Sequence, residues 1–90
     1  MVDFLPPRPN PASGGAAFAF VLANAPEARV ELFDPRGGLV RALRVAAGAG
    51  PHTVHWDGRD DRGRPVPAGV YLARLTAGAE VRIRRFVIAP

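Results

Sequence analysis

Apolar side chains recur at every second position in several short stretches of this chain. Because residues two apart on a β-strand point to the same side, each such set predicts one buried strand face. The sets are Phe18, Phe20 and Leu22; Val30 and Leu32; His52, Val54 and Trp56; Tyr71, Ala73 and Leu75; and Val81 and Ile83. Turn-forming residues separate the stretches that carry them, which are 16–23, 28–33, 39–45, 52–57, 69–75 and 80–88. All have the length of strands, and none is long enough to indicate a helix.

The turn between the second and third stretches predicts how they pair. Asp34–Gly37 has Asp in the first position, Pro in the second and Gly in the fourth, the pattern of a type I turn. We therefore expect 28–33 and 39–45 to form an antiparallel hairpin. The apolar residues of 39–45 do not all fall on the same face of a regular strand. A β-bulge, which adds one residue to a strand, would bring them to one face. The phase also changes at Arg84–Phe86, which leaves the inward residues of the last strand open there.

The spacing of strands and turns predicts the fold class. About seven short strands with a turn every 8 to 12 residues are typical of an immunoglobulin-like antiparallel β-sandwich, and a small barrel is the alternative. We assign residues 9–90 to this all-β domain and residues 1–8 to an N-terminal tail or linker. At 90 residues the chain has room for a single core.

Composition removes most site chemistry. The chain has no Cys and no Lys, which excludes thiol nucleophiles, disulfides, zinc–cysteine sites and lysine Schiff bases. The single serine, Ser13, lies in a loop, and we expect no catalytic residues and no cofactor. The net charge of +4 comes from Arg residues interleaved with acids, which indicates a solvated surface and no nucleic-acid partner. The longest apolar run, residues 16–23, is too short to insert in a membrane.

One acidic cluster is a candidate cation site. Asp57, Asp60 and Asp61 place three carboxylates within five residues, and hard oxygen ligands of this kind bind calcium. Their spacing differs from that of a helix-loop-helix calcium loop, and two Arg lie among them. We therefore expect a hydrogen-bonded turn, with Gly63 supplying a left-handed backbone conformation.

Two pairs of side chains have both a binding and a structural interpretation. His52 and His55 are three residues apart, which on a strand places them on opposite faces and disfavours a shared metal ion. Trp56 and Tyr71 could stack on a sugar ring if they were exposed. Both follow the alternation of their strands, so we expect them in the core.

Several of these residues belong together in a family pattern. Pro9–Pro11, Val30–Asp34 and Phe86–Ile88 frame a more specific block whose signature residues are Trp56, Asp57, Gly58, Asp60, Gly63, Gly69 and Tyr71. The pattern resembles the immunoglobulin-like domain of the flagellar hook-capping protein. It is still more similar to the C-terminal modules of secreted bacterial proteins, including type IX secretion sorting domains.

The resemblance implies a non-catalytic C-terminal module of a larger exported protein, acting in secretion sorting, surface attachment or assembly. A ligand-binding module for carbohydrate or calcium is the alternative. The implied partners are export or surface machinery, or the passenger domain of the parent protein, at an extracellular or cell-surface location, and we expect a monomer in isolation. Residues 1–8 lack the basic head and apolar core of a secretory signal. The exposed residues we expect to contact a partner are Arg82, Arg84 and Arg85.

Overall fold

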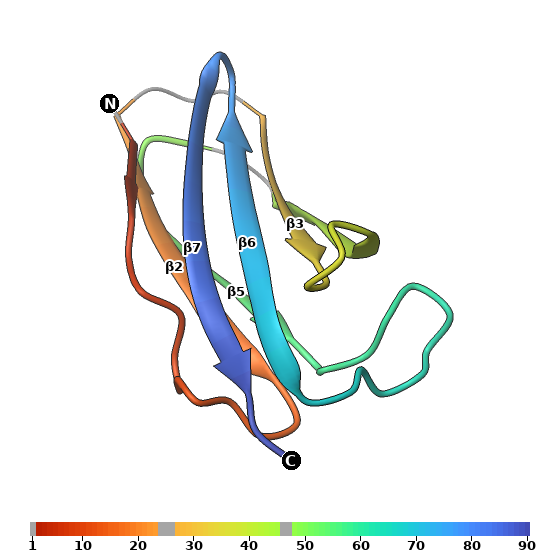
Figure 1. Cartoon of the computed structure of the whole chain (residues 1–90). Coiled ribbons are helices and arrows are strands. Elements are labelled where there is room, and N and C mark those ends of the chain that lie inside the picture. The colour runs from red at the N-terminus through yellow and green to blue at the C-terminus, as the bar shows by residue number, and fades with distance from the viewer. Residues whose placement is uncertain (1, 24–26, 46–47) are drawn as a thin grey trace.

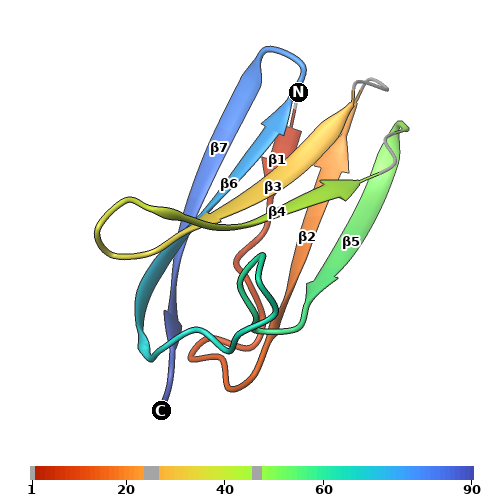
Figure 2. The ribbon, with the colours of Figure 1, turned by 90° about the vertical axis from the view of Figure 1, so that its right-hand side faces the viewer.

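The computed structural model describes residues 2–23, 27–45 and 48–90, and these residues form seven strands. The strands are β1 (Val2–Phe4), β2 (Ala16–Leu22), β3 (Ala28–Phe33), β4 (Leu39–Val45), β5 (Gly50–Trp56), β6 (Gly69–Ala77) and β7 (Glu80–Ile88). They form a three-stranded sheet of order β1-β2-β5 and a four-stranded sheet of order β4-β3-β6-β7 (Figures 1 and 2). All neighbours are antiparallel. The predicted immunoglobulin-like sandwich is therefore confirmed.

The inward faces of the two sheets meet in one aromatic core. The predicted stripes of β2, β3 and β6 are buried, and Trp56 at the end of β5 is only 3% exposed. Phe86 of β7 lies at the centre, with its ring centroid 5.5 Å from Phe18, 6.1 Å from Trp56 and 6.1 Å from Tyr71. The contacts of Phe86 with Phe18 and Trp56 are edge-to-face, and such contacts add to the free energy gained by burying the rings. The core thus joins residues from β2, β5, β6 and β7.

The β3–β4 hairpin has the predicted turn and the predicted bulge. The amide of Gly37 donates to the carbonyl of Asp34 at 2.9 Å, as a type I turn requires. Leu32 pairs with Arg41, but the next residue, Phe33, pairs with Leu39, so one residue of β4 is left without a partner. This β-bulge resolves the conflicting phases of the β4 sequence.

Residues 2–4 correct the expectation of an N-terminal tail. Val2–Phe4 pairs with β2, and Val2 and Phe4 are 8% and 3% exposed. A three-residue strand shows one alternation only, which is too little to distinguish it from a tail by periodicity. Residues 2–4 therefore form an edge strand of the sandwich.

The first half of β7 corrects a second expectation. Val81 and Ile83, expected on a buried face, are 47% and 59% exposed. Phe86 and Ile88 fix the phase of the strand, and its pairing with β6 keeps one register from end to end. The inward positions in this half are consequently occupied by two arginines, which lie beside the short strand β1.

The end of β7 is covered by the chain segment that carries the Pro-Asn-Pro motif. The amide of Val87 donates to the Asn10 side-chain oxygen at 2.9 Å, and the carbonyl of Val87 accepts from the amide of Ala12 at 2.7 Å. These bonds satisfy backbone groups that an edge strand would otherwise leave open. Among the described residues there is no helix long and apolar enough to cross a membrane.

Candidate functional site

The family-specific block forms a compact loop, residues 57–68, which we call the signature loop. Trp56, at its start, donates its indole N–H to the carbonyl of Arg59 at 2.8 Å. The amide of Val66 donates to the carbonyl of Gly58 at 3.0 Å. The loop is therefore folded onto itself and onto the buried indole ring.

Asp60 organises the tip of the signature loop. One oxygen of its carboxylate accepts the amides of Arg62 and Arg64, both at 2.9 Å. The backbone N–H of Arg64 is the largest cause that lowers the pKa of Asp60, because it binds the charged form. Gly63 has φ +80°, so the turn geometry expected for these residues is observed.

A guanidinium group from β4 lies among the oxygens of this loop. Arg41 Nη1 is 3.2 Å from Asp57 Oδ1 and 3.1 Å from the Arg59 carbonyl, and its Nε is 3.7 Å from Asp61 Oδ1. These carboxylate and carbonyl oxygens are the groups that a calcium ion would bind. Arg41 therefore supplies the positive charge from within the chain.

Sequence reasoning missed Arg41. Arg41 lies opposite the buried Leu32, which places it at an inward position of β4. A charged residue at such a position was the sequence feature that could have revealed it. Such a position indicates a specific partner. The partner, however, lies 16 residues away across a second loop, which no local pattern reveals.

Gly58 is required by close contact between two loops. It has φ +80°, and a Cβ atom there would lie 2.8 Å from the carbonyl carbon of Gly14. A Cβ atom on Gly15 would in turn lie 2.5 Å from the Trp56 carbonyl oxygen. No side chain fits at either contact, so the signature Gly58 holds the signature loop against residues 14 and 15.

Tyr71 fixes the other end of the signature loop. Its hydroxyl donates to the Pro67 carbonyl at 2.5 Å, an arrangement like the tyrosine corner of immunoglobulin folds. Burial, followed by the charge of Asp34, raises the pKa of Tyr71. Gly69 has φ +157°, and a Cβ added there would make ordinary contacts with Pro35 and Tyr71.

The aromatic pair considered for sugar stacking is buried. Trp56 is 3% exposed and Tyr71 is 1% exposed, which confirms their predicted place in the core. His52 stacks on Phe20 with centroids 5.4 Å apart, whereas His55 is exposed on the opposite face. In the ranges 2–23, 27–45 and 48–90, no group of three His, Cys, Asp or Glu is placed to hold a metal ion.

The three arginines expected to contact a partner do not form one surface. Arg82 pairs with Glu80 at 3.1 Å, and Arg84 Nε donates to the Phe4 carbonyl at 2.7 Å. Consecutive residues of a strand point to opposite faces, so Arg85 points away from the face of Arg82 and Arg84. Its guanidinium makes no ion pair or hydrogen bond with any described residue. The structure therefore separates a free Arg85 from two engaged arginines.

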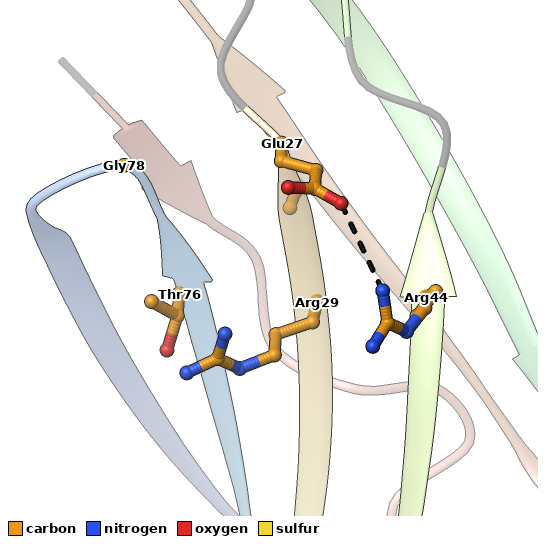
Figure 3. A pocket seen from close by; sticks show the side chains of 6 residues that line it. Glu27, Arg29, Arg44, Thr76 and Gly78 are labelled. Atoms are coloured by element: carbon orange, nitrogen blue, oxygen red, sulfur yellow. Dashed lines mark ion pairs between the residues drawn. The ribbon is translucent and has the colours of Figure 1, made fainter.

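A shallow hollow of about 380 Å³ lies at the end of the four-stranded sheet where β3 begins and β4 and β6 end (Figure 3). Two arginines line it, and both have acidic partners. Arg44 lies 3.8 Å from Glu27, as the dashed line shows, and Arg29 lies 3.3 Å from Glu31. The charge of this hollow is therefore largely balanced within the chain.

Solved structures with the same fold include a flagellar protein and two proteins of Porphyromonas gingivalis. FlgD from Xanthomonas campestris, described in relation to hook capping in flagellar assembly, is 28% identical with a TM-score of 0.64; the match covers 99% of this chain and 70% of FlgD. PorU from Porphyromonas gingivalis is 22% identical with a TM-score of 0.78. PorZ, a surface component of the type IX secretion system of the same organism, is 21% identical with a TM-score of 0.69. Both matches cover 99% of this chain but only 9% of PorU and 11% of PorZ.

No curated protein matches the chain. The family model described as the FlgD Ig-like domain matches residues 9–80, which include the whole signature loop and six of the seven strands completely or in part. This chain belongs to the FlgD Ig-like domain family.

Proposed function

We propose that this domain is a non-catalytic C-terminal module of a larger exported bacterial protein and acts through protein contacts in secretion sorting. Surface attachment and assembly are the related activities in the same class. The observation that carries the proposal is the use of the signature residues. The polar groups of four of them form hydrogen bonds within the fold: those of Trp56, Asp57, Asp60 and Tyr71. The family-specific block thus has a structural role. We infer that the domain acts through its surfaces and not through a reactive cluster in this block.

The comparisons support the same class of function. The related domains occupy small parts of PorU and PorZ, and PorZ is described as a surface component of a secretion system. FlgD is described in relation to flagellar assembly. A domain found in such proteins is suited to directing or joining other protein parts. We extend that use to the parent protein of this chain.

The ligand-binding alternative has less support. A carbohydrate module of this size would need exposed aromatic rings, but Trp56 and Tyr71 are buried. A calcium module would need the oxygens that surround Arg41. Sorting through protein contacts is therefore favoured over ligand binding.

A transfer experiment tests the proposal. Residues 1–90 are fused behind a signal peptide and an inert fluorescent reporter, and the fusion is expressed in a host that has a type IX system. We expect the reporter at the cell surface or in the medium. The matched control carries Gly58→Val, which forces the two loops apart and should leave the reporter in the periplasm. Periplasmic retention of the folded, unmodified fusion would contradict the sorting proposal.

A further inference from the structure

The outer face of the four-stranded sheet, which points away from β1, β2 and β5, is unusually apolar. Of the eight large hydrophobic residues that are exposed in the described part of the chain, six lie on it, and each is at least 38% exposed. They are Leu39, Val70, Leu72, Val81, Ile83 and Val87. Exposed apolar residues are normally scattered, and their concentration on one face is typical of an interaction surface. Strands β6 and β7 of this sheet lie toward the viewer in Figure 1.

The register of the strands makes these residues neighbours. Val70 lies opposite Val87, and Leu72 lies between Phe33 on one side and Arg85 on the other. Residues that pair across antiparallel strands share a face and contact each other. Arg85 therefore lies opposite Leu72, with Val70 and Val87 beside it toward the end of the sheet.

A groove passes over this position. It has a volume of about 580 Å³ and is lined by Val70, Leu72, Arg85 and the hairpin turn Asp34–Gly37. The one acid in its lining is Asp34, whose carboxylate already accepts the amides of Arg36 and Gly38 at 2.9 Å. Among the described residues, the guanidinium groups of Arg36 and Arg85 have no ion-pair or hydrogen-bond partner.

The remaining charges of this face are paired. Arg74 donates to Glu31 at 2.9 Å and lies over the ring of Phe33, and Arg29 shares the same carboxylate. Glu31 therefore binds both arginines in the middle of the sheet and balances one of their two positive charges. The groove at its end, by contrast, offers two unpaired cations beside apolar side chains.

We propose that this groove and the apolar residues around it are the docking surface of the domain, and that the surface binds a protein segment with apolar side chains around a carboxylate. The inference rests on the proposed function and names the chemistry of the partner. The carboxylate would pair with Arg85, and flanking aliphatic side chains would cover Val70, Leu72 and Val87. A partly desolvated charge pair within an apolar surround gives both affinity and specificity.

A second copy of this chain fits the surface poorly. A two-fold contact through this face would bring like patches together, and the free charges of the groove are all positive. The carboxylate of Glu31 is already shared by Arg74 and Arg29. Charge complementarity therefore favours a different, acidic protein segment.

A peptide titration tests the surface directly. The full chain, labelled with ¹⁵N, is titrated with two blocked peptides, Leu-Val-Asp-Val-Leu and Leu-Val-Asn-Val-Leu, whose single difference is the carboxylate. We expect amide shifts at residues 70–72 and 85–87, and binding of the Asp peptide about fivefold tighter. Arg85→Gln should abolish this preference, whereas Arg62→Gln, a change at an exposed arginine of the signature loop, should retain it. Equal binding of the two peptides, or a preference that survives Arg85→Gln, would overturn the inference.

The reporter fusion separates this inference from the proposed function. Relocation that is lost with Arg85→Glu but kept with Arg62→Glu, at unchanged melting temperatures, supports the docking surface. Relocation that persists with Arg85→Glu overturns the surface as the sorting contact and leaves the proposed function intact. If the unmodified fusion is retained while the peptide preference is observed, the sorting proposal fails and the docking surface stands.

Discussion

Arg84 Nε lies 2.7 Å from the carbonyl oxygen of Phe4 and so ties the last strand of the sandwich to the first. The contact joins two residues 80 positions apart, on the side where β1 and β7 face each other. Arg84, which contacts β1, and Arg85, which we propose as a partner contact, are adjacent in this sequence and point to opposite faces of one strand.

Arg84→Gln should lower the free energy of unfolding, whereas Arg85→Gln should not. The loss of a hydrogen bond from a charged donor costs about 1.5 to 3 kcal/mol, and the partial exposure of this contact favours the lower end. A surface change such as Arg85→Gln stays within about 0.5 kcal/mol. Urea unfolding followed by the fluorescence of the single tryptophan measures both. Equal losses for the two variants would contradict the assignment of Arg84 to the fold.

Trp56→Ala should destabilise the domain by about 3 to 5 kcal/mol, because it removes a buried ring and leaves a cavity. For a 90-residue domain this is a large part of the total stability. In the unmodified protein, tryptophan emission should be shifted to the blue and should move to the red on unfolding. Emission like that of free indole in native buffer would show that Trp56 is exposed.

Calcium should leave the stability unchanged, because Arg41 already supplies a positive charge to the oxygens of the signature loop. The melting temperature is compared in millimolar calcium and in chelator. A ligand that binds the native state raises the melting temperature. An increase of several degrees with calcium would overturn the interpretation of this loop as a hydrogen-bonded turn.

Gly58→Ala should destabilise the domain more than Gly37→Ala. Both glycines have a left-handed backbone, with φ of +80° and +85°, but a Cβ atom would collide with residue 14 only at Gly58. The two variants therefore share the backbone strain and differ in the collision. Thermal melts of both variants provide the comparison, and identical shifts would mean that the two loops are not in close contact.

Ionisation of Tyr71 should occur above the ordinary tyrosine pKa of 10.0, because burial and the charge of Asp34 disfavour the phenolate. The chain has one tyrosine, so near-ultraviolet absorbance follows this group alone. A raised pKa in the folded state means that its contribution to stability is complete below pH 10.0 and is lost as the pH rises through the folded-state value. Denaturant should return the titration to the ordinary value. A native titration at or below that value would contradict the buried hydroxyl.

Much of the scaffold could be read from local sequence. Six of the strands were predicted within a few residues, as was the bulged hairpin, because alternation and turn chemistry act between neighbouring residues. The turn at Asp60 and Gly63 was predicted for the same reason. The placement of Trp56 and Tyr71 in the core followed from the alternation of their strands.

Contacts between distant residues decided the rest. The strand at Val2–Phe4 depends on pairing with β2, and the inward phase of β7 depends on its register with β6. The bonds of Arg41 with the signature loop and of Arg84 with Phe4 join residues 16 or more positions apart. The sequence by itself determined the alternating strands and their turns, because these depend on the intrinsic geometry of short segments. Only the tertiary structure decided that Arg41 and Arg84 bind within the sandwich while Arg85 lies on its outer face, because that choice depends on which strands lie opposite each other.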